Sequence, residues 1–169
     1  VPEGVPPISP ETLEKIRALK EVEEVSAYYA RSAYDTIYFR STSLDGGNLL
    51  GIDDAWFGVY GYRILKGRGF SEKDYTAFRK VAVVDKVTAS SLFQDEEPLG
   101  QTLLISGEPF TVIGVAGQSS SFMPVINSVS DYYTYMDTTG GKVFVPSAAW
   151  SILYRFDEPA NLVIRAAST

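Results

Sequence analysis

The side chains that could do chemistry in this sequence are carboxylates, hydroxyls and amines, because histidine and cysteine are both absent. That absence excludes Ser-His and Cys-His nucleophile pairs, imidazole zinc sites and a histidine proton shuttle. No Ser-x-x-Lys spacing occurs either, so the serine–lysine acyl-transfer signature is missing. We therefore predict no catalytic residue.

Aspartate and glutamate residues gather in three short clusters. Paired carboxylates could hold calcium, or act as the acid and base of a glycosidase. None of the clusters has the spacing of a calcium loop, and acids are favoured at helix N-termini. We interpret them as solvated turns and helix ends, and expect no metal site. The clusters are Glu21 with Glu23 and Glu24, Asp53 with Asp54, and Asp95 with Glu96 and Glu97.

The stretch GVYGYRILKGRG resembles a nucleotide-binding motif only superficially. Gly67-Arg68-Gly69 is followed by Glu72 where a dinucleotide fingerprint needs its third glycine, and no Gly-Lys-Ser or Gly-Lys-Thr phosphate loop occurs. We therefore expect no dinucleotide, ATP or other cofactor. Arg68 could bind an anion, but packing on Phe70 or pairing with a nearby acid is the more ordinary role.

The long Tyr- and Ser-rich stretch at 117–141 offers candidate binding residues. A connection of this length is unusual in a compact domain unless it binds something or is disordered. Its aromatic side chains with polar tips are typical of interface anchors. The alternative is that the stretch folds back over the core as an extra hairpin, and both interpretations stay open. The candidate partner or ligand contacts are Phe122, Met123, Tyr132, Tyr133 and Tyr135.

Composition and charge bound the class of protein. The 169 residues, 45% hydrophobic and 21% charged, are typical of one globular domain, or of two closely joined lobes around the irregular stretch at 117–141. With a net charge of −6 and 15 scattered Lys and Arg residues, we expect no nucleic-acid partner. No apolar run approaches the roughly 20 residues of a membrane-spanning helix. The chain begins at Val1 without methionine, so we expect a mature or excised piece.

Strand and helix patterns alternate unevenly, which predicts an α+β fold with a mixed sheet and packed helices rather than a regular doubly wound sheet. Ser9 and Pro10 can open a helix that ends near Lys20. Asp53 and Asp85 can cap helices that end near 59 and 93. The predicted strands occupy two segments within 25–42 that are separated by a bend, then 49–52, 81–84, 101–106, 109–115, 142–146 and 162–166, with a helix at 147–154 and a glycine-punctuated loop at 64–75.

The segment EEPLGQTLLISGEPFTVIGV, residues 96–115, is among the most strongly patterned in the chain. Two β-rich runs flank Gly107 and Glu108, which suit a two-residue type II′ turn because glycine comes first. Pro109 favours the start or the edge of a strand. We interpret the segment as a stiff hairpin that holds shape and contains no site.

Several short motifs, taken in order, resemble one known family. From about Val22 to Ala166 the chain is similar to the extracytoplasmic core domain of MacB-type ABC transporter permeases, a family that also embraces FtsX-like permeases. Each motif alone is weak, whereas their combination is specific. Family members often carry glycine where this chain has Asp85 and Gln94. The motifs are Gly51-Ile52-Asp53, Gly67-Arg68, Leu92-Phe93, Pro98-Leu99-Gly100 and the run from Phe110 to Val115.

The resemblance implies a position between the first and second of four transmembrane helices, on the extracytoplasmic side of the cell membrane. It implies no catalytic activity in this domain, because ATP hydrolysis would occur in a separate cytoplasmic ATP-binding domain or subunit. A second permease copy would be a partner, and an extracytoplasmic partner protein could be another. In such systems the outer domain is expected to couple helix movement to substrate or partner handling. Porter-like βαβ elements, and a second small β-rich lobe, would fit this family.

The rival interpretation is a free-standing extracellular ligand-binding or sensory domain. In that case we expect Tyr132, Tyr133 and Tyr135 to line a closed pocket. A domain placed between two membrane helices should instead have both chain ends on one side, so that its first helix and last strand end near one another.

Overall fold

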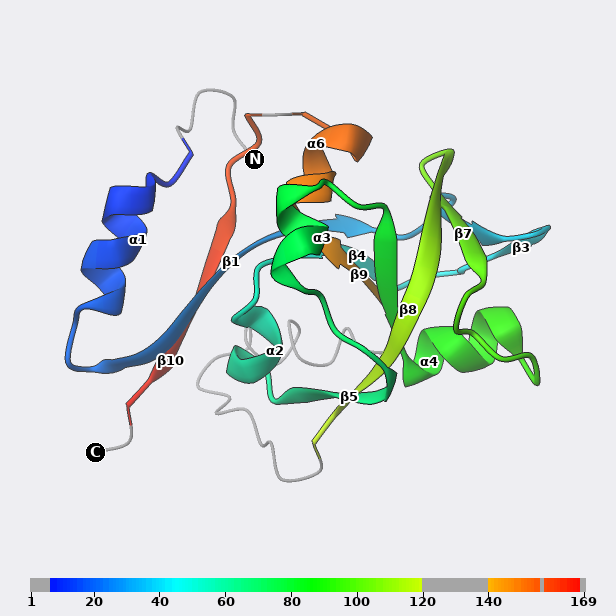
Figure 1. The fold of residues 1–169 in the computed structure, drawn as a ribbon, viewed down its shortest axis with the longest axis horizontal. Coiled ribbons are helices and arrows are strands. Elements are labelled where there is room, and N and C mark those ends of the chain that lie inside the picture. The colour runs from blue at the N-terminus through cyan, green and yellow to red at the C-terminus, as the bar shows by residue number, and fades with distance from the viewer. Residues whose placement is uncertain (1–6, 120–139, 156, 168–169) are drawn as a thin grey trace.

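The computed structural model describes residues 7–119, 140–155 and 157–167. Within these residues ten strands form one mixed sheet, with short helices packed around it (Figure 1). The strands are β1 (Val22–Ser32), β2 (Ile37–Phe39), β3 (Thr42–Ser43), β4 (Asn48–Ile52), β5 (Tyr62–Gly67), β6 (Val81–Asp85), β7 (Thr102–Ile105), β8 (Glu108–Gln118), β9 (Lys142–Pro146) and β10 (Asn161–Ala166). The helical elements are α1 (Pro10–Arg17), α2 (Trp56–Val59), α3 (Glu72–Thr76), α4 (Lys86–Thr88), the π-helical turn η1 (Ala89–Phe93), the 3-10 turn η2 (Ser147–Ala149) and α6 (Trp150–Leu153).

The strands follow the order β10-β1-β4-β9-β6-β8-β7-β2-β3, and β5 pairs with β8 outside this path. β4 is parallel to β9 and β6 is parallel to β8, whereas the other described pairs are antiparallel. The helical stretch α4–η1 and strand β7 lie between β6 and its parallel neighbour β8 in the chain. This mixed sheet with few helices confirms the predicted α+β class.

The central strands β4, β6 and β9 are buried on both faces, which explains why their sequences are almost continuously apolar. Successive residues face two different cores. Val143 joins a large cluster that includes Trp150, whereas its neighbour Phe144 joins a smaller, mainly aromatic cluster around Trp56. The two cores therefore share one set of strands.

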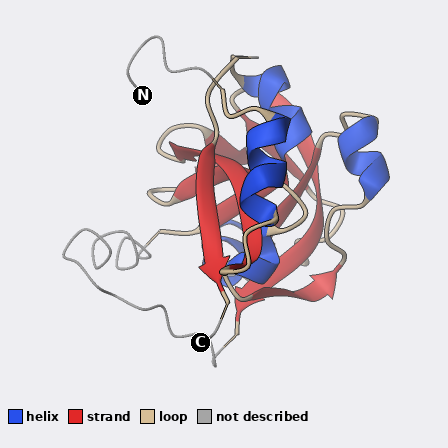
Figure 2. Cartoon of the chain, turned by 90° about the vertical axis from the view of Figure 1, so that its left-hand side faces the viewer, coloured by secondary structure: helices blue, strands red, loops and turns tan. Residues whose placement is uncertain are grey.

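Helix α1 begins where the sequence predicts. The Ser9 side chain accepts a hydrogen bond from the Thr12 amide at 3.1 Å, and Pro10 occupies the first helical position. The helix ends at Arg17, a little before the predicted end. Viewed from the α1 side, it lies in front of the strands at the β1–β10 end of the sheet (Figure 2). Among the described residues no helix is long and apolar enough to cross a bilayer.

The predicted hairpin forms, but its turn lies one residue earlier than expected. Ile105 pairs with Glu108, which leaves Ser106 and Gly107 as the turn. Both have positive φ, 48° and 81°. Positive φ at both positions defines a type I′ turn, whose twist matches that of the flanking strands. The type II′ assignment at Gly107-Glu108 was therefore wrong, because Glu108 is already part of the ladder.

Two other segments test the strand predictions. The 25–42 segment contains the predicted bend, which lies between β1 and β2 and includes Asp35 with a φ of 52°. The 64–75 segment is not a simple loop, because β5 continues to Gly67 and α3 starts at Glu72. The strand was missed because residues 62–67 form a strand by pairing with β8, and their own apolar pattern does not indicate one.

The chain that follows the first helix meets the end of the last strand. The Ala167 amide donates to the Glu21 carbonyl at 2.8 Å, next to the Val22–Ala166 pair. The contact is made by the residues after the helix, because α1 itself ends at Arg17. However, α1 begins at the other end of β10 (Figure 1). The described chain therefore enters the fold near one end of β10 and leaves it at the other, which does not support the expectation that both chain ends lie on one side.

Candidate functional site

The predicted contact residues all fall in 120–139, outside the described residues, so they stay a prediction. The structure does describe the two places where the chain passes into and out of that range, at Ser119 and Gly140. These two places fix the frame for any site in this part of the chain. The predicted residues are Phe122, Met123, Tyr132, Tyr133 and Tyr135.

The chain reaches Ser119 along β8, and the turn that follows α2 holds it there. The Ser119 amide donates to the Gly61 carbonyl at 2.8 Å. The Gln118 side-chain amide donates to the Tyr60 carbonyl at 3.3 Å, and Gln118 itself pairs with Tyr62 in the β5–β8 ladder. Main-chain carbonyls just after α2 therefore determine where this end of β8 lies.

The chain returns at Gly140 and Gly141 through a crossing that only glycine permits. A Cβ on Gly47 would lie 1.9 Å from the Gly141 carbonyl oxygen, and a Cβ on Gly141 would lie 2.1 Å from Thr88 Oγ1. The Gly141 carbonyl accepts from the Asn48 amide at 3.0 Å, which starts the β4–β9 pairing. This end of the segment is thus fixed by close backbone contact.

Asp85 and Thr88 organise the same end of the sheet. Asp85 caps α4 as predicted, because its Oδ1 accepts from the Thr88 amide at 2.8 Å. Thr88 Oγ1 in turn donates to the Lys142 carbonyl at 3.2 Å, on the returning strand. Lys86 approaches the other strand, since a Cβ on Gly117 would lie 3.2 Å from Lys86 Cε. The start of α4 therefore contacts both β8 and β9 next to the 120–139 range.

An aromatic cluster borders this frame, centred on Trp56 of α2. The ring centroids of Tyr60, Phe144 and Tyr62 lie 4.3, 5.0 and 5.3 Å from that of Trp56. Burial, together with the Asp85 carboxylate, raises the pKa of Tyr62 to about 12, so its hydroxyl stays protonated at neutral pH. Trp56 Nε1 is buried without a hydrogen-bond partner among the described residues. Trp56 and Phe144 are 3% and 0% exposed, so the cluster is part of the smaller core, with Tyr60 and Tyr62 partly exposed at its margin.

Asp53 fastens α2 to the sheet. Its carboxylate accepts from Ser26 Oγ at 2.6 Å and from the Ala27 amide at 2.7 Å, both on β1. It also accepts from the Ala55 amide at 3.2 Å, one residue before α2. Ala55, not Asp53, is the N-cap residue, so the predicted cap was wrong in detail. The role of Asp53 as a link from α2 to β1 was not predicted.

Arg68 pairs with an acid, which is one of the two ordinary roles expected for it. Arg68 Nη1 lies 2.7 Å from Asp74 Oδ2, and the Asp74 side chain is fully buried. Asp74 also accepts from the Ser71 amide and Ser71 hydroxyl, at 2.7 and 2.9 Å, in a capping box that starts α3. Burial alone would raise the pKa of Asp74, but the hydrogen bonds from Arg68 and Ser71 outweigh it and hold this pKa below its ordinary value.

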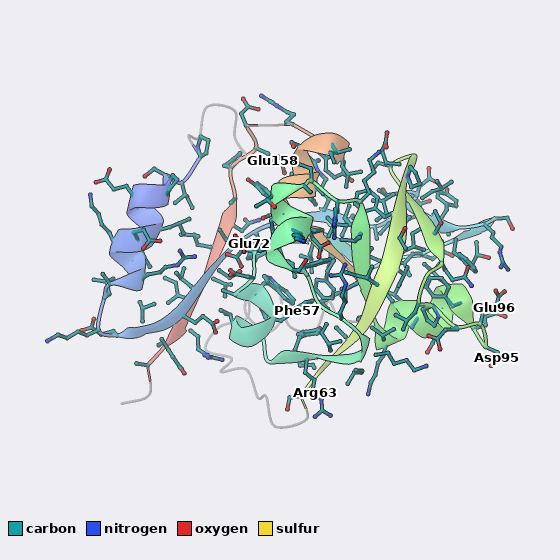
Figure 3. All side chains as sticks on the ribbon, viewed as in Figure 1. Phe57, Arg63, Glu72, Asp95, Glu96 and Glu158 are labelled. Carbon is teal, nitrogen blue, oxygen red and sulfur yellow. The ribbon has the colours of Figure 1, made fainter. Side chains whose placement is uncertain are left out.

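The acidic clusters serve as ion-pair partners and turn residues. Glu96 pairs with Arg40 at 2.7 Å, and Glu97 pairs with Lys66 at 3.2 Å. Figure 3 shows Asp95 and Glu96 together in the loop after η1, at the end of the molecule opposite α1. Within the described part of the chain, no group of three acidic residues is placed to hold a metal ion.

The motifs that carry the family resemblance have steric roles in this structure. Gly51 leaves room for Trp150, because a Cβ there would lie 2.7 Å from the indole ring. Gly67 has a φ of +68°, and a Cβ would lie 2.2 Å from the Ile113 carbonyl oxygen. The Gly100 amide, just after Pro98-Leu99, donates to the Val112 carbonyl at 2.8 Å. These residues hold neighbouring parts of the fold close to one another.

Sequence reasoning missed two features of this region. The aromatic cluster could have been found from the density of rings in WFGVYGY, residues 56–62. Arg165 carries no comparable signal, because it contacts Gly58, 107 positions away in the chain.

Comparison with known proteins identifies the family of this chain. The family described as MacB-like periplasmic core domain matches residues 2–169. The chain therefore belongs to the family of MacB-like periplasmic core domains.

Individual relatives point the same way. Over 145 residues, 84% of this chain, it is 36% identical to the macrolide export ATP-binding/permease protein MacB of Neisseria gonorrhoeae, of which it spans 22%. Over 166 residues, 98% of this chain, it is 26% identical to the uncharacterized ABC transporter permease YvrN of Bacillus subtilis, of which it spans 38%. The chain thus corresponds to a minor part of each relative.

Solved structures share the fold at low sequence identity. The extracellular domain of the noncanonic ABC-type transporter YknZ from Gram-positive bacteria aligns with a TM-score of 0.71 and 19% identity, covering 95% of this chain and 74% of that one. The periplasmic region of MacB from Actinobacillus actinomycetemcomitans aligns with a TM-score of 0.68 and 19% identity, covering 97% of this chain and 67% of that one.

Proposed function

We propose that this chain is a non-catalytic, extracytoplasmic module of an ABC transporter permease, which couples movement of flanking transmembrane helices to substrate or partner handling. The family match over residues 2–169 is the observation that carries the proposal. The 36% identity to a protein named as an ATP-binding/permease protein supports the same class. The coupling role rests on the fold described next.

Coupling requires a body that moves as one piece, and the sheet supports this. Strands from β10 to β3 are hydrogen-bonded in one continuous order. Two cores share the central strands, and packed interiors resist local deformation. We therefore treat residues 1–169 as one domain in this proposal.

The partners follow from the same class. An ATP-binding subunit or domain would lie on the cytoplasmic side, as part of the transporter. A second permease copy would pair with the first, and an extracytoplasmic protein could bind the outer face. The relatives' names, ABC transporter permease and ATP-binding/permease protein, support the first of these partners.

Location can be tested with single cysteines, because these 169 residues contain none and any cysteine elsewhere in the parent protein can be replaced beforehand. In cells that express the full-length parent protein, Tyr34→Cys, at a residue 74% exposed, should react with a membrane-impermeant maleimide. Val83→Cys, at a residue 0% exposed, is the matched control and should react only after denaturation. Labelling of Tyr34→Cys only after cell lysis would refute the extracytoplasmic location. A parent protein without apolar spans on both sides would favour the free-standing binding domain.

Coupling can be tested in proteoliposomes that contain the full-length permease and its ATP-binding partner. Spin labels at Phe78→Cys in two permease copies should change their separation between nucleotide-free and ATP-bound states. Labels at Phe78→Cys and Leu19→Cys within one copy, both at exposed residues, should keep their separation. An inter-copy separation that stays constant through the ATP cycle would contradict the coupling role.

A further inference from the structure

Strand β10 is the last element of the described chain and forms one end of the sheet. It is bonded to β1 and to no other described strand. Its ladder ends at the Val22–Ala166 pair, beside the point where the chain leaves the fold. Any displacement of the chain beyond Ala167 reaches the domain first through this strand.

Arg165 connects β10 to the C-terminal end of α2. Its Nη1 donates to the Gly58 carbonyl at 2.7 Å. Its other nitrogens lie 3.2 Å from Glu23 Oε2 and 3.1 Å from Glu24 Oε2, on β1. The planar guanidinium can reach all of these groups together, which an ammonium group cannot do with the same geometry.

Gly58 also lies close to the Glu24 carboxylate. A Cβ at this position would lie 2.8 Å from Glu24 Oε2, so a larger residue would displace the carboxylate that accompanies Arg165. The Gly58 carbonyl also accepts from the Gly61 amide at 3.2 Å. One carbonyl oxygen therefore receives both the arginine and the amide that closes the turn after α2.

That same turn holds the end of β8. The Gly61 carbonyl accepts from the Ser119 amide at 2.8 Å, and the Tyr60 carbonyl accepts from the Gln118 side chain at 3.3 Å. A short series of hydrogen bonds thus leads from Arg165 through Gly58 and Gly61 to Ser119. It joins the place where the chain leaves the fold to the place where β8 gives way to 120–139.

We propose that Arg165 is a positioning residue that couples β10 to the end of β8 through the turn after α2. The inference rests on the proposed function and deepens it, because it names the contact through which movement at the chain's exit would reach the end of β8. Its test uses the 169-residue chain alone and does not depend on membrane topology.

The test is amide hydrogen exchange of the wild-type chain and three variants. In Arg165→Met, the Ser119 and Gly61 amides should exchange about tenfold faster, which corresponds to a coupling of about 1.4 kcal/mol. The Ser106 amide donates to the Thr36 carbonyl near the opposite end of the sheet, and it should keep its wild-type rate because its local opening leaves the Arg165 contacts intact. Arg165→Lys keeps the charge near Glu23 and Glu24 but not the fork geometry, so it should resemble Arg165→Met at Ser119. Arg155→Met removes an exposed arginine that pairs with Asp157, and it should match the wild type.

A reverse experiment uses Ser119→Pro, which removes the amide that donates to Gly61. Coupling is reciprocal, so the Ala167 amide should exchange faster in this variant, while Ser106 again stays unchanged. Equal acceleration at Ser119 and at the remote Ser106 in Arg165→Met would overturn the proposal, because it would show only general loosening of the fold. Unchanged exchange at Ser119, or wild-type behaviour of Arg165→Lys, would also overturn it. None of these outcomes bears on the location that cysteine labelling tests.

Discussion

The middle of the sheet and its β10 edge are held by different kinds of contact. In the middle, β8 has neighbours on both sides, and backbones touch where glycine removes the side chain, as at Gly114 against the Arg68 carbonyl. At the edge, β10 has one neighbour and is partly exposed. Side chains fasten it at each end, through Arg165 and through Glu158, which Figure 3 shows near α6.

This difference predicts that the middle of the sheet and its β10 edge respond unequally to substitution and to local opening. Close backbone contacts cannot relax, so the middle should tolerate few substitutions. Polar contacts at partly exposed positions contribute modest free energies, so the edge should open more easily than the rest. A domain that transmits movement needs both properties: a body that keeps its shape and an attachment that responds.

The largest effect is expected at Gly114 of β8. A Cβ there would lie 2.3 Å from the Arg68 carbonyl oxygen. Gly114→Ala should therefore lower the free energy of unfolding by about 3 kcal/mol or more. Gly107→Ala is the matched control, since nothing lies within 4 Å of a Cβ there and only its φ of +81° opposes alanine. It should cost about 1 kcal/mol. Urea unfolding measures both, and equal losses would show that the close contact in the middle relaxes.

The buried Asp74 carboxylate should give the next largest effect. Asp74→Asn keeps the shape but loses the charge that faces Arg68 and Ser71, so we expect a loss of about 2 kcal/mol at pH 7. Because the folded-state pKa of Asp74 is depressed, its contribution is present above the ordinary aspartate pKa near 3.9 and declines as pH falls below that value. The variant should therefore lose less stability than the wild type between pH 5 and pH 3, on urea unfolding at each pH. Parallel pH profiles would contradict this role.

Most of the fold could be predicted from the sequence because local signals agreed with the tertiary environment. The central strands are apolar on both faces, and Ser9-Pro10 carries its own capping chemistry. β5 was missed because its order comes from β8, and the hairpin turn was misplaced because Ser106 gives little sign that it adopts positive φ. Register decided the turn, and register is a property of the paired strands.

The candidate site was less accessible to sequence reasoning. The predicted contact residues at 122–135 lie outside the described residues, so only their frame can be compared with the prediction. Within that frame, Arg68 was expected to pair with an acid, and the short spacing to Asp74 made this possible to foresee. Arg165 and Gly58 come together only because β10 returns to β1 beside α2, which depends on the whole topology.

Gln94 is one of the two positions, with Asp85, where the family resemblance implies glycine, and its backbone conformation is one that favours glycine. Its φ of 52° and ψ of −110°, just after η1, are conformations that favour glycine. Gln94→Gly should raise the free energy of unfolding by about 1 kcal/mol. Gln101→Gly, at a residue without positive φ, should instead lower it by about 0.5 kcal/mol. Thermal unfolding of both variants measures the difference, and destabilisation by Gln94→Gly would contradict the strain.

The smallest effect concerns the contact that precedes β10. Arg31 Nη2 lies 2.6 Å from Glu158 Oε2, and the Glu158 side chain is only 17% exposed. A double-mutant cycle with Arg31→Met and Glu158→Gln should give a coupling free energy of about 0.5–1 kcal/mol, because this pair is partly shielded from water. Glutamine at 158 still offers an oxygen to the Trp150 indole, which donates to Glu158 at 3.1 Å. The same cycle on Arg155 and Asp157, at 74% and 63% exposed, should give a coupling close to zero. If both cycles gave the same value, the fastening of β10 would be no stronger than an ordinary surface pair, and the contrast between middle and edge would rest on Arg165 alone.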